Sequence, residues 1–214
     1  MRRFRLAVVE CAAGGGGAVE AEAVAQRLAV GVRTVVLVEG DSDRIALEVL
    51  AARYGRRLDA EGISVVPLGG ATSIGRFLKM FGPQGIDVRL AGLCDAGEED
   101  FFQQRLEAAG VGNARSRDEM EQLGFYVCVA DLEDELIRAL GPEEVQEVVE
   151  AQGELRSFRI FQKQPAQRER TVERQLLRFM GTHSGRKAHY ARSLVEVLEP
   201  GQVPRPLDRL LAAI

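Results

Sequence analysis

Acidic side chains follow directly on apolar runs at three places in this sequence. Residues 34–38 form a run of branched apolar residues, Glu39 follows it, and Asp43 lies four residues further on. Asp95 and Asp131 follow two later apolar runs in the same way. Carboxylates that converge repel one another unless a cation neutralises them, and hard oxygen ligands suit Mg²⁺ or Mn²⁺. The pattern therefore predicts a divalent-metal site, provided that the fold brings these acids together.

A parallel sheet is the scaffold that would do so. Strands are expected within residues 34–40, 63–70, 86–97 and 125–131, and helices within 42–55, 73–82 and 98–110. This alternation is typical of right-handed crossovers and of a mainly parallel sheet that is buried on both faces. We expect an α/β fold in which the carboxyl ends of the strands meet at one edge, where ligands bind. Glu133 and Glu135, just beyond the fourth strand, are further candidates at that edge.

Each acid also has a structural explanation. Asp43 and Asp131 could cap helices, and Glu133 and Glu135 could be solvated acids that the helix dipole favours in a first turn. Glu39 is the hardest to explain in this way, because it terminates an apolar strand and precedes a glycine that lets the backbone turn. The metal site is thus inferred from the acids together and not from any one of them.

The C-terminal part of the chain differs in pattern and in charge. Residues 1–33 are predicted to be a helical or loop lead-in, 34–135 the α/β domain, and 136–214 a helical extension. Residues 151–190 contain nine Lys or Arg against three Glu, a charge of +6, whereas the whole chain has −4 and its remainder therefore −10. This basic segment could meet an anionic partner or could be a solvated helical surface. The irregular stretch 158–170 mixes Phe158 and Phe161 with basic residues, and we favour phenylalanines that anchor a loop to the core over ones that contact nucleic acid.

Composition excludes several classes of protein. A chain of 214 residues, 46% of them hydrophobic, suits one compact domain of ordinary size or one domain with an appendage. Its apolar runs fall short of the roughly 18 residues of a membrane span, so we expect a cytoplasmic protein with no membrane partner. The three cysteines have no CxxC spacing, which argues against a disulfide framework and a zinc site. For His183 and His189 we favour solvated or capping roles over acid/base work.

Three segments carry a family resemblance. "VVLVEGDSDRIALEVLA", "ISVVPLGGATSIGRFLKMF" and "GLCDAGEED" resemble the TOPRIM domain, in the form found in OLD-family (overcoming lysogenization defect) nucleases, over about residues 34–135. The resemblance implies a small parallel sheet, a Mg²⁺- or Mn²⁺-dependent nuclease and a nucleic-acid substrate, more often DNA. It makes Glu39 a metal ligand or a general acid/base. "SGRKAHYA" resembles a late lysine-bearing helix of these enzymes, which makes Lys187 a catalytic candidate for stabilising charge on the phosphate. The implied metal ligands are Glu39, Asp43, Asp95, Glu133 and Glu135.

The sequence departs from the family pattern at one position. Asp95 matches the first aspartate of an Asp-x-Asp motif, but the second falls on Gly97, which has no side chain to ligate a metal. Glu98 and Glu99 are next to the gap and are alternatives. OLD nucleases usually carry an ATPase domain, and the resemblance here is to a TOPRIM unit alone. Three interpretations stay open: a nuclease, a metal- and nucleic-acid-binding module of low activity, and a subunit that works with a separate ATPase. Homodimer formation is also left open.

Overall fold

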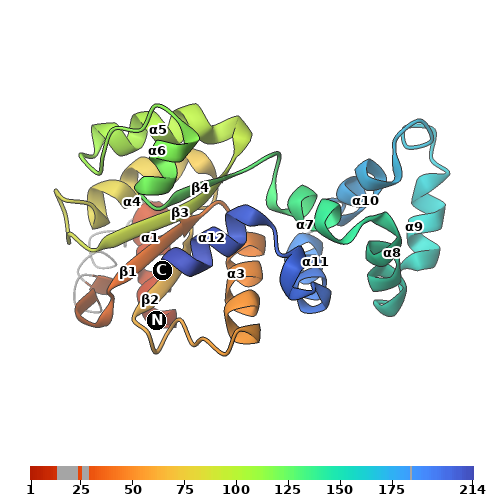
Figure 1. Ribbon diagram of the computed structural model, residues 1–214, viewed down its shortest axis with the longest axis horizontal. Helices are drawn as coiled ribbons and strands as arrows, with labels where there is room; N and C mark the ends of the chain where they lie inside the picture. Colours follow the sequence, from red (N-terminus) through yellow and green to blue (C-terminus); the bar gives the residue numbers. More distant parts are fainter. Residues whose placement is uncertain (14–23, 26–28, 184) are drawn as a thin grey trace.

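The computed structural model describes residues 1–13, 24–25, 29–183 and 185–214, so residues 14–23 and 26–28 of the predicted lead-in lie outside the description. Its centre is a four-stranded parallel sheet in the order β2-β1-β3-β4 (Figure 1). The expected α/β fold is thereby confirmed. The strands are β1 (Thr34–Val38), β2 (Ile63–Pro67), β3 (Arg89–Asp95) and β4 (Phe125–Cys128).

The central strand β1 explains why the sheet is covered on both faces. All its residues are buried, with Val36 and Val38 in one apolar cluster and Val35 and Leu37 in the other. Alternate side chains of a strand point to opposite faces, so a continuous apolar run requires a layer of helices on each side. Val38 pairs with Pro67, and Asp95 with Cys128. Neighbouring strands therefore end side by side, at the edge where the acids follow.

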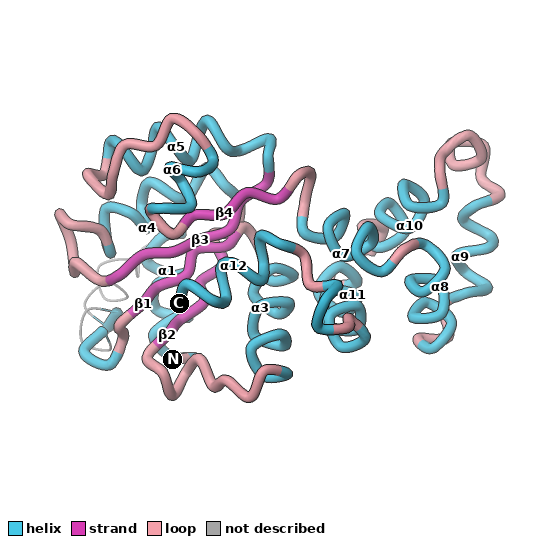
Figure 2. Tube along the Cα trace, viewed as in Figure 1, coloured by secondary structure: helices cyan, strands magenta, loops and turns pink. Residues whose placement is uncertain are grey.

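Helices cover the two faces of the sheet (Figures 1 and 2). One group contributes to the apolar cluster that contains Val36, and the other to the cluster that contains Val35. The first group includes α3 (Asp41–Arg53), α11 (Arg186–Val197) and α12 (Arg205–Ala213); the second comprises α1 (Arg2–Ala13), α4 (Ile74–Phe81), α5 (Glu99–Ala108) and α6 (Arg117–Gln122). The C-terminal region thus returns to the sheet, where α11 packs on α3 and α12 packs on β4.

The start of α3 differs from the expected one. The helix begins at Asp41, one residue before the expected range, and its N-cap is Gly40. The Asp43 carboxylate accepts a hydrogen bond from the Gly40 amide at 2.7 Å, which satisfies one of the free amides at a helix start. The strand passes directly into the helix, so the acids after β1 stay close to the sheet edge.

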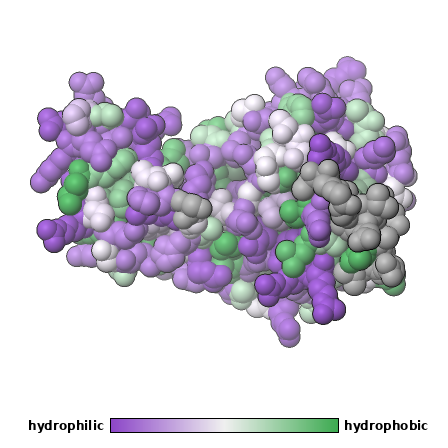
Figure 3. All heavy atoms as spheres, turned by 180° about the vertical axis from the view of Figure 1, so that it is seen from behind, coloured by the Kyte–Doolittle hydropathy of each residue, from purple (hydrophilic) through white to green (hydrophobic). Residues whose placement is uncertain are grey.

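A helical arm, residues 142–180, projects from the α/β body beyond α7 (Leu132–Leu140) (Figure 1). It consists of α8 (Pro142–Ala151), α9 (Leu155–Gln162) and α10 (Val172–Met180). Seen from behind, its surface is mainly hydrophilic (Figure 3). The stretch expected to be irregular is in part α9. Phe158 and Phe161 are buried against Phe179, with ring centroids 5.2 and 5.6 Å apart, which confirms the anchoring role.

No helix in the described ranges has both the length and the apolar character that crossing a membrane requires.

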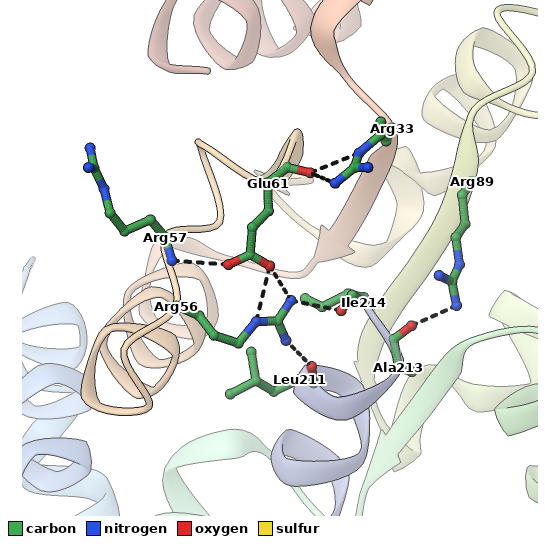
Figure 4. Close-up of polar contacts among 8 residues, drawn as sticks. All are labelled: Arg33, Arg56, Arg57, Glu61, Arg89, Leu211, Ala213 and Ile214. Atoms are coloured by element: carbon green, nitrogen blue, oxygen red, sulfur yellow. Dashed lines mark hydrogen bonds and ion pairs between the residues drawn. The ribbon is translucent and has the colours of Figure 1, made fainter.

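The last turn of α12 is held by arginines from the body (Figure 4). The Arg56 guanidinium donates to the Leu211 carbonyl at 2.5 Å and to that of Ile214 at 2.8 Å, while Glu61 accepts from the same group. Arg89 donates to the Ala213 carbonyl at 2.6 Å. Cations that bond the free carbonyls at a helix end stabilise it.

Replacing Arg56 with alanine should therefore destabilise the fold by about 1–3 kcal/mol, the range for hydrogen bonds that involve a charged group. Urea unfolding followed by circular dichroism measures this change. The neighbouring Arg57→Ala is the matched control, because the Arg57 side chain points away from this cluster (Figure 4). A loss of the same size in both variants would contradict the role of the Arg56 side chain in holding the last turn of α12.

Candidate metal centre

A cleft of about 610 Å³ opens at the carboxyl ends of the strands. The turn from β1 into α3, the glycine turn after β2, the end of β3, the start of α7 and the start of α11 all contribute to it. The charged residues that line it are Glu39, Asp41, Asp43, Asp95, Asp131, Glu133 and Lys187. The fold thus brings together the predicted acids with the exception of Glu135, and adds Asp41, which the sequence had not placed in the ligand set.

Two glycines shape the floor of the cleft. Gly69 and Gly70 follow β2 and have φ values of 69° and 121°, which L side chains rarely adopt. The Gly70 amide donates to the Glu39 carbonyl at 3.3 Å. The turn is therefore tied to the end of β1, and no side chain from it fills the space in front of Glu39.

Asp43 is a buried carboxyl in this cleft. Burial is the main cause that raises its pKa to about 7, and the charges of Glu133 and Glu39 raise it further, whereas the Gly40 amide opposes the shift. The Asp43 side chain caps the start of α3, the structural role that its position in the sequence allowed, and it also lines the cleft. The two roles are compatible because a carboxylate has two oxygens.

Asp95, at the end of β3, is the second strongly shifted acid. Burial raises its pKa to about 8, together with the charges of Glu39 and Asp43 and a hydrogen bond with Glu39. The pKa of Asp131 is also raised, first by burial, although its carboxylate caps α7 by accepting from the Asp134 amide at 2.8 Å. In this cleft, burial first and the charges of neighbouring acids second oppose ionisation of Asp43, Asp95 and Asp131.

Glu133 and Lys187 form an ion pair between α7 and α11, with Nζ 3.2 Å from Oε2. The Glu133 side chain is only 4% exposed. Its other oxygen, Oε1, is buried and has no hydrogen-bond partner among the described residues. Burial opposes charge on Lys187, but Glu133, Asp131 and Asp43 raise its pKa, so the lysine stays a cation beside the acids. An unpartnered carboxylate oxygen in such a cleft fits a cation ligand.

Glu135 lies on the other side of the first turn of α7. Its carboxylate accepts from the Val129 amide at 2.7 Å and pairs with Arg138 at 2.9 Å. It lines a second cleft, apart from the acids that surround Glu133. Two residues along a helix correspond to about 200° of rotation at 3.6 residues per turn, so both side chains cannot face one cleft.

The acids suit a hard divalent cation in chemistry, because they offer carboxylate oxygens and no thiol or imidazole. Within the described parts of the chain, no three acidic, histidine or cysteine side chains form a ready-made coordination sphere. Ion binding would therefore require side-chain rotation in addition to the release of protons from Asp43 and Asp95. Gly97 is exposed beside Asp95, and a Cβ added there would meet nothing within 4 Å.

These shifts predict how stability depends on pH. The folded protein holds protons on Asp43 and Asp95 up to about pH 7 and 8, whereas unfolded aspartates release them near pH 4. The folded state thus binds more protons across this window, and stability in chelator should fall as the pH rises through it. Thermal unfolding from about pH 5 to pH 8.5 checks this. Asp95→Asn should flatten the decline, whereas Asp208→Asn, an exposed control on α12, should not. Equal slopes in the wild type and Asp95→Asn would contradict the assignment.

Arg186 and the histidines lie outside the acid cluster. Arg186 pairs with Glu154 at 2.8 Å and stacks on the Phe179 ring at 4.4 Å, and Tyr190 donates to the same glutamate at 2.7 Å. These contacts fasten the start of α11, and with it Lys187, to the arm. His183 and His189 are exposed and hydrogen-bond to Thr182 and Gln152. Sequence reasoning missed the Glu154 contacts, since only the tertiary fold joins residues 32 and 36 positions apart.

Comparisons with known proteins agree with this geometry. Residues 32–96 match the family model described as "Overcoming lysogenization defect protein-like, TOPRIM domain". The C-terminal region of the Xanthomonas campestris pv. campestris OLD protein has a similar structure, with a TM-score of 0.64 and 26% identity over 86% of this chain and 92% of that one. The C-terminal region of the Burkholderia pseudomallei OLD protein is similar in fold, with a TM-score of 0.63 and 23% identity over 85% and 96% of the two chains. No curated protein sequence matches this chain.

Proposed function

We propose that this chain, in which residues 32–96 form a TOPRIM domain of the OLD-like, nucleic-acid-processing type, is a divalent-metal-dependent nuclease. The observation that carries the proposal is the unpartnered Glu133 oxygen, buried in a cleft in which burial and neighbouring charges raise the pKa of Asp43 and Asp95. A cation would relieve both conditions. A bound Mg²⁺ or Mn²⁺ would polarise a phosphodiester and lower the pKa of an attacking water.

The side chains divide into ligands and a charge-stabilising group. Glu39, Asp43, Asp95 and Glu133 would hold the ion, and Glu39, at the end of the central strand, is the candidate general acid/base. Lys187 would donate to a non-bridging phosphate oxygen, where its charge stabilises the negative charge that develops. The ion pair of Glu135 with Arg138 favours a positioning role for Glu135, which holds the Val129 amide at the turn into α7.

The helical arm supplies the positive charge that an acidic cleft lacks. Within the described ranges, seven exposed basic side chains of the arm form no ion pair: Arg156, Arg159, Lys163, Arg168, Arg170, Arg174 and Arg178. Contacts of this kind bind the phosphate backbone without reading sequence. The arm projects beyond α7, next to the edge of the sheet where the acids lie (Figure 1). DNA is the favoured substrate.

The test is cleavage of supercoiled plasmid and of end-labelled single- and double-stranded DNA and RNA, in Mg²⁺, in Mn²⁺ and in chelator. We expect cleavage only with metal, and the labelled products identify the substrate. Folded wild-type protein that binds metal but cleaves none of these substrates would overturn the proposal. That result would favour a binding module or a subunit that requires a separate ATPase.

Gly97 offers a variant that adds function. A Cβ added at Gly97 meets nothing within 4 Å, so Gly97→Asp places a second carboxylate two residues from Asp95 without a clash at Cβ. One further oxygen ligand should tighten Mn²⁺ binding by about tenfold, equivalent to about 1.4 kcal/mol. Titration calorimetry at pH 8 measures this change, and Gly97→Asn is the uncharged control. Unchanged affinity in Gly97→Asp would indicate that the added carboxylate lies out of reach of the ion.

A further inference from the structure

A second cleft, which we name the arginine cleft, lies beside the acidic one. Its volume is about 420 Å³, and it is lined by Arg117 of α6, Arg138 of α7, Arg205 of α12, Val129 and Pro206. Glu133 lines the acidic cleft and Glu135 the arginine cleft, so the two lie on opposite sides of the first turn of α7. A helix with its side chains is about 10 Å across, so one nucleic-acid strand can reach both.

The arginines are oriented but not saturated. Arg117 uses Nε to bond Glu99 at 2.8 Å, which leaves its two terminal nitrogens available. Arg138 uses Nε and one terminal nitrogen for Asp134 and Glu135, whereas Arg205 donates to Glu121 through both terminal nitrogens and keeps only Nε and the outer N–H groups. All three side chains are between 46% and 61% exposed. A guanidinium has five N–H donors in a planar fork that suits phosphate, and its carboxylate partner fixes the direction of the fork.

Apart from Glu121 and Glu135, which pair with Arg205 and Arg138, the rest of the wall is apolar. Val129 is 60% exposed at the mouth of this cleft, next to Pro206. None of the described residues that line the arginine cleft is aromatic, so the cleft offers no ring on which a base could stack. Base stacking is therefore not the means of binding. Arginines beside small apolar groups suit a phosphate with its sugar, a contact that positions a strand without specifying sequence.

We propose that the arginine cleft binds a backbone phosphate of the nucleic-acid strand whose scissile phosphate meets the acidic cleft. This inference rests on the proposed function and adds to it a subsite that sets the register of the strand. The acidic cleft repels phosphate until a cation is bound. In the arginine cleft, the free terminal N–H donors of Arg117 and Arg138 hold the neighbouring phosphate even without a cation.

The test pairs a charge removed from the protein with a charge removed from the ligand. Binding of a fluorescein-labelled DNA is measured by anisotropy in chelator, with single phosphates replaced in turn by neutral methylphosphonate. We expect one or two positions at which the replacement weakens wild-type binding about three- to tenfold. At these positions the slope of log affinity against log salt concentration should also fall by about one phosphate contact. In Arg117→Gln/Arg205→Gln, binding of unmodified DNA should be weaker by a similar factor, and replacement at those positions should have no further effect.

Two variants serve as controls. Arg192→Gln removes an exposed arginine that pairs with Glu196 on α11, outside both clefts, and should leave the methylphosphonate pattern unchanged. Arg117→Lys/Arg205→Lys keeps the two charges but lacks the planar guanidinium fork, so it should bind DNA more tightly than the glutamine variant and less tightly than the wild type. If the glutamine variant does not fold, the lysine variant takes its place in the test.

The outcomes separate this inference from the proposed function. If methylphosphonate replacement weakens binding of the glutamine variant as much as it weakens binding of the wild type, the subsite is overturned and the nuclease proposal stands. If the methylphosphonate pattern is as expected but no substrate is cleaved in Mg²⁺, the subsite is supported and the nuclease proposal is overturned. Wild-type protein that binds no DNA would overturn the subsite outright.

Discussion

Replacing Glu39 with glutamine should reduce metal-dependent cleavage at least about 100-fold, the loss typical for a group that stabilises or activates the reacting atoms. Glu39 directly follows strand β1, lines the acidic cleft and helps to raise the pKa of Asp95. Glutamine keeps the shape of the side chain and removes its charge. The loss should therefore appear in the rate at saturating Mg²⁺ as well as in the metal affinity, and a time course of plasmid cleavage separates the two.

Glu196→Gln is the matched control for this variant. It removes one carboxylate charge from the surface of α11, outside the cleft, where Glu196 pairs with Arg192. We expect no change in cleavage. Wild-type activity in Glu39→Gln would contradict the assigned site, and would point to a contaminating nuclease or to another centre on the chain.

The second large effect concerns the helical arm. Phe179→Ala should destabilise the protein by about 3–5 kcal/mol, the range for a buried phenylalanine that leaves a cavity. Phe179 is 3% exposed, lies between Phe158 and Phe161, and has the Arg186 guanidinium on its ring. Because Arg186 precedes Lys187 at the start of α11, loosening of this contact should also weaken cleavage.

Urea unfolding measures the loss, and Ile160→Ala is the comparison within the same arm. Ile160 is 59% exposed on α9, so its truncation should change the free energy of unfolding by less than about 0.5 kcal/mol. Equal effects of the two variants would mean that the aromatic cluster does not hold the arm together.

Most of the candidate site could be predicted from the sequence because the direction of the strands determines where the acids that follow them lie. Apolar runs separated by helical segments imply parallel strands, and parallel strands end at the same edge. Glu39, Asp95 and Asp131 needed no more than this rule to be placed together. Gly69 and Gly70 end the second expected strand segment, and their positive φ values explain why glycine occurs there.

The remaining features depend on side-chain direction and on tertiary contacts. Helical periodicity separates Glu133 from Glu135 by more than half a turn, a signal that was present in the sequence and pointed against a shared site. The partner of Glu133 is Lys187, 54 residues away, and only the packing of α11 on α7 brings them together. The arginine cleft combines α6, α7 and α12, so local patterns gave no indication of it.

The most direct test of the central claim is a titration of the wild-type protein with Mn²⁺ at about pH 8, where Asp43 and Asp95 can release their protons. Calorimetry on the wild type, Asp95→Asn and the control Asp208→Asn reports whether the acidic cleft holds the ion. We predict saturable binding of at least one ion, unchanged in the control and weakened at least about tenfold, or about 1.4 kcal/mol, in Asp95→Asn. Absence of binding, or equal binding by all three proteins, would contradict a metal centre in this cleft.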